Sequence, residues 1–214
     1  MRKKYVLFDL DGTLTDSQEG IMNSIEYTLR HFGIQVEDRS ALRPWLGPPL
    51  ADSLMKYHGF DRERALEGVK KYREYFDAKG IFENRVYPGI EKLLGQLQSD
   101  GHILMTATSK PEVAARRIAD HFNLTRFFTF IGGATLDDSR VHKGDVIRYV
   151  LETNRIGDLS EVMMVGDREN DIRGARQNGL ESVGVLYGYG DREELEAAGA
   201  DHIAERVEDI AKYL

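Results

Sequence analysis

The chain has 214 residues, 41% hydrophobic and 30% charged, enough for one large domain or for a core with an inserted unit. Its 29 basic and 36 acidic residues give a formal net charge of −7, which argues against a nucleic-acid binder with a broad basic surface. The absence of cysteine excludes disulfides, thiolate catalysis and cysteine-based zinc sites.

The first apolar run, residues 5–8, is too short for the core of a signal peptide. No later stretch approaches the length that spans a membrane. We therefore expect a cytoplasmic protein without a membrane partner.

Short apolar runs recur along the chain, each followed by a polar or glycine-rich turn and then by a helical pattern. Five runs are typical of parallel strands buried on both faces, at residues 5–8, 103–107, 127–131, 162–165 and 182–186. Helical patterns at residues 90–97, 111–122 and 145–153 lie between them. This alternation predicts an α/β fold with a doubly wound parallel sheet.

The first two predicted strands are separated by about ninety residues, far more than a crossover needs. Apolar stripes at helical spacing begin at Ile21, Leu50 and Ala65 within this gap. We expect an inserted α-helical unit at residues 16–82, and a core domain made of residues 1–15 and 83–214.

Two acids, Asp9 and Asp11, follow the first predicted strand directly, and Gly12 lets the chain turn sharply away. The carboxyl ends of parallel strands form the ligand crevice of such a sheet, so both acids are expected there. A solvated surface loop is the plain alternative, but it does not account for the residues that end the other strands.

Other polar residues belong to the same predicted edge. Thr108, Ser109 and Lys110 follow the second strand, where hydroxyls and amides before a helix favour a phosphate site or merely a helix cap. The fourth strand is followed by Asp167 and Asp171, which a simple helix-capping pair would also explain. Lys143 opens the preceding helix.

Carboxylates gathered this closely would repel one another and raise their own pKa values. A hard divalent cation with oxygen ligands removes that conflict, and Mg²⁺ suits carboxylates, phosphate and water. The site therefore makes electrostatic sense with a metal and an anionic substrate.

The four segments 9–13, Thr108, Lys143 and 166–171 resemble the four motifs of the haloacid dehalogenase superfamily, in chain order. The resemblance covers essentially the whole chain, and the helical insertion is similar to the α-helical cap of that superfamily. Segments 43–50 and 185–190 look most like its phosphoglycolate-phosphatase and 5′-nucleotidase-like branch.

The resemblance implies a magnesium-dependent phosphatase for a small phosphorylated metabolite, phosphoglycolate or a nucleoside 5′-monophosphate. It implies that Asp9 is the nucleophile that becomes phosphorylated and Asp11 the general acid and base. The metal would be held by Asp9, by Asp11 through its backbone carbonyl and by Asp167, and Asp171 would complete the metal site by anchoring this shell or by binding through water. The phosphoryl group would be surrounded by Gly12, Thr13, Thr108, Ser109, Lys110 and Lys143.

A phosphomutase of the same superfamily is the main alternative, because it keeps both Asp9 and Asp11. Thr13 weakly favours the phosphatase, since mutases of this branch more often carry valine there. A phospho-acceptor signalling module also uses acids and a lysine on such a sheet, but the large insertion argues against it.

In the inserted unit, Arg43 could bind a substrate anion or be solvated, and Trp45 could belong to the core or to the substrate pocket. We expect both to contact substrate. The sequence identifies neither the particular phosphate monoester nor the oligomeric state.

Overall fold

The computed structural model describes residues 2–137 and 139–214. It divides into two compact units: unit 1 comprises the residues up to Thr15 and Val86–Leu214, and unit 2 comprises Asp16–Arg85. Two short paired strands, β2 (Thr15–Asp16) and β3 (Arg85–Val86), carry the chain from one unit to the other.

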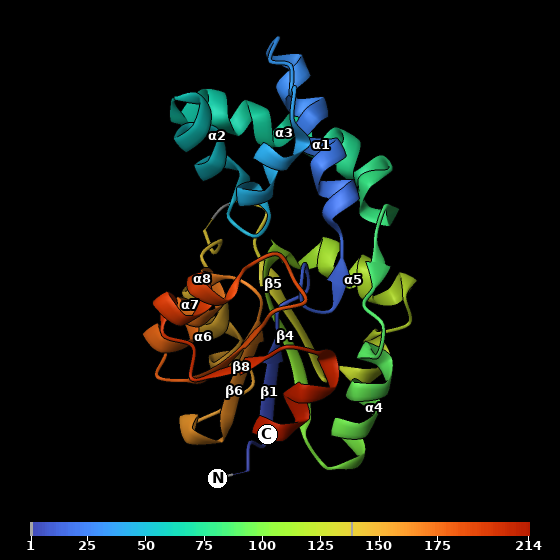
Figure 1. The fold of residues 1–214 in the computed structure, drawn as a ribbon, viewed down its shortest axis with the longest axis vertical. Coiled ribbons are helices and arrows are strands. Elements are labelled where there is room, and N and C mark those ends of the chain that lie inside the picture. Colours follow the sequence, from blue (N-terminus) through green and yellow to red (C-terminus); the bar gives the residue numbers. More distant parts are fainter. Residues whose placement is uncertain (1, 138) are drawn as a thin grey trace. The chain divides into compact units, whose positions relative to one another are not determined.

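Unit 1 is built on a six-stranded sheet in the order β5-β4-β1-β6-β7-β8, and its neighbouring strands are parallel (Figure 1). The strands are β1 (Tyr5–Phe8), β4 (Ile103–Pro111), β5 (Phe130–Ala134), β6 (Val162–Gly166), β7 (Glu181–Val185) and β8 (His202–Ala204). All residues of β6 are buried, as expected of a strand covered on both faces. The predicted α/β fold with a doubly wound parallel sheet is confirmed.

Helices cover both faces of this sheet. Figure 1 shows one group on one face, namely α4 (Ile90–Ser99), α5 (Glu112–His121) and the 3₁₀ helix η5 (Val207–Tyr213). The other face carries α6 (Lys143–Thr153), α7 (Glu169–Gln177) and α8 (Arg192–Ala198). Buried side chains of α6, such as Val146 and Ile147, form one core cluster with Leu7 of β1 and Met105 of β4. Two short 3₁₀ turns, η3 (Thr125–Phe127) and η4 (Leu159–Glu161), precede β5 and β6.

The strand predicted at residues 127–131 is wrong in its position. Phe127 ends the turn η3, and β5 runs later, through Gly132 and Gly133. These glycines are required by close packing rather than by a turn, because a Cβ at Gly132 would overlap Val150 of α6, and a Cβ at Gly133 would crowd the backbone of α5. Strand β8 was missed because it has only three residues, two of them partly exposed.

Unit 2 is helical. It contains α1 (Gln18–His31), η1 (Arg39–Trp45), α2 (Leu50–His58), α3 (Arg62–Ala78) and η2 (Gly80–Phe82). The buried residues of α1 include Ile21, Ile25 and Leu29, the stripe from which this helix was predicted. Helices α1 and α2 both pack against α3, where a Cβ at Gly68 would overlap Leu54.

The register of the sheet aligns the ends of its central strands. Phe8 of β1 pairs with Thr106 of β4 on one side and with Val165 of β6 on the other. The residues that follow these three therefore emerge together at the carboxyl edge of the sheet. This alignment builds the candidate site.

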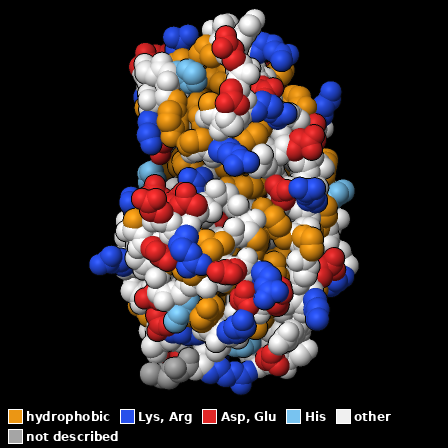
Figure 2. Space-filling view, viewed as in Figure 1, with side chains coloured by type: hydrophobic (Ala, Val, Ile, Leu, Met, Phe, Trp, Pro, Cys, Tyr) orange, Lys and Arg blue, Asp and Glu red, His pale blue; other side chains and the backbone are white. Residues whose placement is uncertain are grey.

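On the face drawn in Figure 2, basic and acidic side chains are interspersed. Within the described part of the chain, no helix combines the length and the apolar character needed to cross a bilayer.

Candidate active site at the carboxyl edge of the sheet

Asp9 lies at the centre of the site, one residue beyond the end of β1. Its amide donates a hydrogen bond to the carbonyl of Val165 at 2.9 Å, so the ladder to β6 continues through this residue. The residue is only 6% exposed. Its Oδ1 atom is buried and accepts no well-directed hydrogen bond, although a cation lies beside it.

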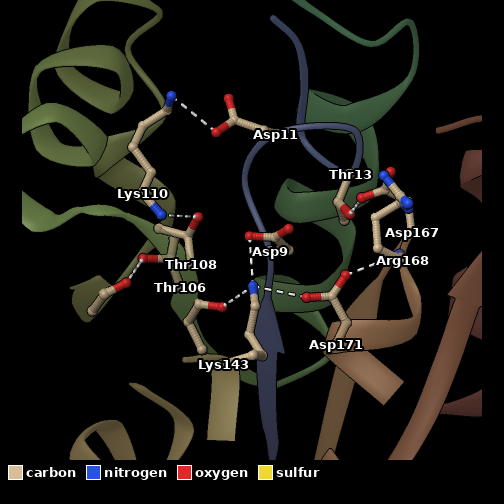
Figure 3. A network of polar contacts seen from close by, with 12 residues as sticks. Asp9, Asp11, Thr13, Thr106, Thr108, Lys110, Lys143, Asp167, Arg168 and Asp171 are labelled. Atoms are coloured by element: carbon tan, nitrogen blue, oxygen red, sulfur yellow. Dashed lines mark hydrogen bonds and ion pairs between the residues drawn. The ribbon is translucent and has the colours of Figure 1, made fainter. Parts of the chain in front are cut away.

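That cation is the ammonium group of Lys143, the first residue of α6. Its Nζ atom lies 2.8 Å from Asp9 Oδ1 and 2.8 Å from Asp171 Oδ1, and it donates to the carbonyl of Ala107 at 2.8 Å. Figure 3 shows the two carboxylates converging on it. Burial alone would lower the pKa of Lys143, but the charges of Asp171 and Asp9 outweigh burial and raise this pKa, so the side chain stays protonated.

Asp171 and Asp167 enter from the β6–α7 connection. Asp171 Oδ2 accepts a hydrogen bond from the amide of Arg168 at 3.0 Å, so it caps α7 with one oxygen while its other oxygen faces Lys143. Asp167 is completely buried and accepts bonds from the Thr13 hydroxyl at 3.1 Å and the Tyr189 amide at 2.8 Å. The capping interpretation of Asp171 is therefore correct as far as it goes, but it accounts for only half of the carboxylate.

Both acids are shifted toward protonation. Burial, together with the charges of Asp171 and Asp9, raises the pKa of Asp167 well above its usual range. Burial also raises the pKa of Asp171 to about 6; Asp9 adds to this rise and Lys143 opposes it. The protein alone thus holds more negative charge here than it can stabilise at neutral pH.

One carboxylate oxygen from each of Asp9, Asp167 and Asp171 lies within 4.8 Å of the others. If all three carboxylates were ionised, the single charge of Lys143 would leave two negative charges in a buried space. The donor set consists of carboxylate oxygens only. These residues therefore fit a hard divalent cation such as Mg²⁺.

Asp11 and the residues after β4 form the other side of the site. Asp11 Oδ2 lies 2.9 Å from the Nζ atom of Lys110, and both side chains are largely buried. Thr108 is 2% exposed, and its hydroxyl accepts a hydrogen bond from the Lys110 amide at 3.2 Å. Ser109 is half-buried. The pairing of β4 with β5 shifts register between residues 108 and 111, so this turn belongs to the end of the strand itself.

The substrate contacts assigned to Gly12, Thr13, Ser109 and Lys110 stay predictions. The Thr13 hydroxyl donates a hydrogen bond to Asp167 within the protein. The backbone conformation and close packing at Gly12 also explain why glycine occupies that position. Its φ is +84°, and an added Cβ would overlap the Asp167 carboxylate. Only glycine allows the loop after β1 to lie this close to Asp167.

Sequence reasoning missed the segment after β7 as part of the site. The Tyr189 amide contacts Asp167, and the Tyr187 hydroxyl donates to the carbonyl of Thr13 at 2.9 Å. It also missed Glu194 of α8, which accepts bonds from the Arg168 side chain at 2.7 Å and the Glu169 amide at 2.8 Å. Two glycines, at positions 188 and 190 shortly after a predicted strand, could have indicated that this segment packs closely against the site.

In unit 2, Arg43 and two further arginines, Arg39 and Arg85, line a cavity of about 700 Å³. Arg85 is paired with Asp16 at 2.6 Å. Trp45 is 5% exposed and stacks on Tyr57 with ring centroids 5.4 Å apart. This is the core position considered for it from the sequence; substrate contact by Arg43 and Trp45 stays a prediction.

The comparisons with known proteins identify the class of enzyme in which this parallel sheet carries a strand-end aspartate, a buried lysine and a carboxylate cluster. The family model described as haloacid dehalogenase-like hydrolase matches residues 6–185. The chain belongs to this family, which confirms the resemblance found in the motifs.

Individual relatives narrow the class. A crystal structure described as a predicted phosphatase from Clostridium acetobutylicum has a TM-score of 0.97 at 50% identity, covering 100% of this chain and 98% of that one. A 5′-nucleotidase of Pseudomonas aeruginosa is 45% identical over 94% of this chain and 91% of its own length. The tyrosine-protein kinase PtkA of Mycobacterium tuberculosis is 41% identical over 86% of this chain but only 62% of its own length. The chain is a phosphatase of the haloacid dehalogenase-like family.

Proposed function

We propose that the chain hydrolyses a small phosphate monoester with the help of Mg²⁺, through a phosphoaspartyl intermediate on Asp9. The observation that carries this proposal is the position of Asp9, a buried carboxylate between the Lys143 ammonium and two further acids. The ammonium group beside this carboxylate reduces the repulsion between it and an anionic phosphoryl group. Asp9 can therefore act as a nucleophile toward phosphorus.

In the first step a carboxylate oxygen of Asp9 forms a bond to phosphorus, and the bond from phosphorus to the leaving oxygen breaks. Asp11 donates a proton to that oxygen, so the product leaves as an alcohol. In this structure Asp11 Oδ2 lies 2.9 Å from Lys110 Nζ, so this pair has to open before Asp11 can donate to the leaving oxygen.

In the second step Asp11, now ionised, accepts a proton from a water molecule as the water oxygen attacks phosphorus. The bond from phosphorus to Asp9 breaks, and inorganic phosphate leaves with Asp9 regenerated. One water is consumed in the cycle. Thr108 and Lys143 stabilise the equatorial phosphoryl oxygens on which charge accumulates.

The acids Asp9, Asp167 and Asp171 would hold Mg²⁺, with the backbone carbonyl of Asp11 as a further ligand. When bound, the ion neutralises the carboxylates and the phosphoryl oxygens, so that two anions can meet. The raised pKa of Asp167 and the raised pKa of Asp171 support this assignment, because both acids need a positive partner to ionise fully at neutral pH.

For the substrate we propose a nucleoside 5′-monophosphate or phosphoglycolate. The 45% identity to the 5′-nucleotidase of Pseudomonas aeruginosa supports the first. We also propose that the helical insertion, predicted at residues 16–82, acts as the specificity-determining cap. Its cavity is lined by arginines, Arg43 among them, and by acids such as Asp16 and Glu83, a mixed lining that is suited to a hydrogen-bonding leaving group.

A phosphomutase keeps the same first step and differs in the acceptor. Transfer to a tyrosine hydroxyl would be a third outcome, and the relation to PtkA makes it worth measuring. Both are distinguished from hydrolysis by the fate of the phosphoryl group.

The test is a panel of phosphate monoesters assayed for inorganic phosphate, together with Asp9→Asn and with acid quench of Asp11→Asn, in which breakdown of the intermediate should be slow, after mixing with ³²P-labelled p-nitrophenyl phosphate. We expect turnover to fall by about 10⁴-fold or more in Asp9→Asn. The quenched Asp11→Asn protein should carry one phosphoryl group on Asp9, as an acyl phosphate that hydroxylamine removes. A quenched protein without this phosphoryl group would mean direct attack by water and would overturn the intermediate; phosphate recovered on a sugar or tyrosine would favour the alternatives.

A further inference from the structure

The loop at residues 187–190, which follows β7, packs directly on Asp167. A Cβ added at Gly188 would overlap the Asp167 side chain and the carbonyl of Gly12. A Cβ added at Gly190 would overlap the carbonyl of Asp167. Backbone therefore lies against backbone at this place. Such contact is only possible with glycine, and it brings the loop close enough to fix its neighbours.

Both carboxylate oxygens of Asp167 are engaged from two separate segments. Oδ1 accepts from the Thr13 hydroxyl at 3.1 Å, and Oδ2 accepts from the Tyr189 amide at 2.8 Å. Two donors on the two oxygens fix the plane of the carboxylate. Its remaining lone pairs are left to face the cluster with Asp9 and Asp171.

Tyr187 completes the arrangement by holding the first of these donors. Its hydroxyl donates to the carbonyl of Thr13 at 2.9 Å. Its ring packs edge-on against Tyr87, with centroids 5.1 Å apart, and this contact fixes the position of the phenol ring. A displaced Thr13 backbone would carry the Thr13 hydroxyl away from Asp167.

We propose that Tyr187 is a positioning residue for the metal site, acting through Thr13 to orient the Asp167 carboxylate toward the cation. The inference rests on the proposed Mg²⁺ site. Partners that orient a metal ligand typically change metal affinity or activity by about 10- to 100-fold when they are removed. Tyr187 reaches Asp167 only through Thr13, so we expect the smaller change in metal affinity, about tenfold.

The experiment measures metal binding in the absence of substrate. Mn²⁺ is titrated into the full-length protein and free Mn²⁺ is followed by electron paramagnetic resonance. Tyr187→Phe should raise the dissociation constant for Mn²⁺ by about tenfold. Activity at saturating Mg²⁺ should be largely kept, so the Mg²⁺ concentration for half-activation should move while kcat changes little.

The matched control is Tyr213→Phe. The Tyr213 hydroxyl also donates to a backbone carbonyl, that of Ile203 at 3.0 Å, and Tyr213 is likewise partly buried in unit 1. It should lose comparable stability, since one hydrogen bond to a carbonyl is removed in each variant, and keep wild-type Mn²⁺ affinity. Equal Mn²⁺ affinity in Tyr187→Phe and the wild type would overturn the inference.

A second variant, Thr13→Val, tests the route of the effect. It removes the hydroxyl that Tyr187 is proposed to hold and keeps the carbonyl, so the double variant should bind Mn²⁺ little worse than Thr13→Val alone. Strictly additive losses would show that Tyr187 does not act through Thr13 and would overturn the route. A wild-type protein that binds no Mn²⁺ would refute the proposed metal site and this inference with it.

Discussion

Replacing Lys143 by methionine removes the only side-chain cation within 3 Å of both Asp9 and Asp171 among the described residues. The new side chain is similar in length and apolar, so packing is largely kept while the charge is lost. Two buried carboxylates then face each other and the nearby Asp167 without compensation. The variant therefore isolates the electrostatic part of the site.

The magnitude follows from the two contacts of 2.8 Å. With an effective dielectric constant of about 20, each corresponds to ~6 kcal/mol of direct attraction, from which the cost of dehydrating three charges must be subtracted. Removing one partner of a buried pair costs about 3–5 kcal/mol in practice. We expect a loss of about this size for Lys143→Met at pH 8 without Mg²⁺.

The loss should shrink as the pH falls. Lys143 opposes the rise in the pKa of Asp171, which stands at about 6 with the lysine present, so the variant raises this pKa further. An acid with a raised folded-state pKa destabilises the fold above its unfolded-state pKa, and the penalty grows until the pH passes the folded-state pKa. The difference in stability between wild type and variant should therefore be smaller at pH 5 than at pH 8.

The assay is urea unfolding with and without millimolar MgCl₂, and the matched control is Lys3→Met. Lys3 is also only 3% exposed, and its Nζ lies 2.8 Å from Glu181 and 2.8 Å from the carbonyl of Ser160, away from the acid cluster. MgCl₂ should stabilise Lys143→Met more than the wild type and should not compensate Lys3→Met. A loss in Lys143→Met that ignores both MgCl₂ and pH would refute the reasoning.

Three further predictions concern catalysis. Exhaustive chelation should abolish phosphate release, and MgCl₂ should restore it; turnover that survives chelation would exclude the proposed metal. Asp11→Asn should release one equivalent of nitrophenol from p-nitrophenyl phosphate in a burst and then stall, because an activated leaving group needs no acid but water still needs a base. Deletion of residues 17–81 with a short linker should reduce turnover of the best panel substrate more than that of p-nitrophenyl phosphate; equal losses would make the insertion merely structural.

The acids of the site could be located from the sequence because a parallel sheet brings the carboxyl ends of its strands to one edge. Asp9 and Asp167 each follow a strand, and the register of β1 with β6 brings such residues to one edge whatever the details of the helices. Lys143 is different. Its place at the start of α6 was predictable, but its contacts with Asp9 and Asp171 depend on how α6 crosses the sheet, and no local pattern encodes that.

The contacts of Asp11 and Thr13 were equally out of reach. The pair between Asp11 and Lys110 follows from the register shift at the end of β4, which a strand predicted to stop at residue 107 cannot contain. The Thr13 hydroxyl was expected near substrate but bonds to Asp167 across 154 positions of sequence. Long-range partners of this kind are decided by packing and not by propensity or periodicity.

Charge and stability are opposed at this edge of the sheet. The protein buries Asp9, Asp167 and Asp171 together with one lysine, an arrangement that lowers the stability of the metal-free fold because buried carboxylates without full compensation are unfavourable. An apolar core at the same place would be more stable but could bind neither a cation nor a phosphoryl group. In the proposed mechanism the excess negative charge has a functional role. It would make the affinity for a divalent ion part of the folding free energy, and the proposed nucleophile, Asp9, would accept an anionic phosphoryl group only with that ion bound.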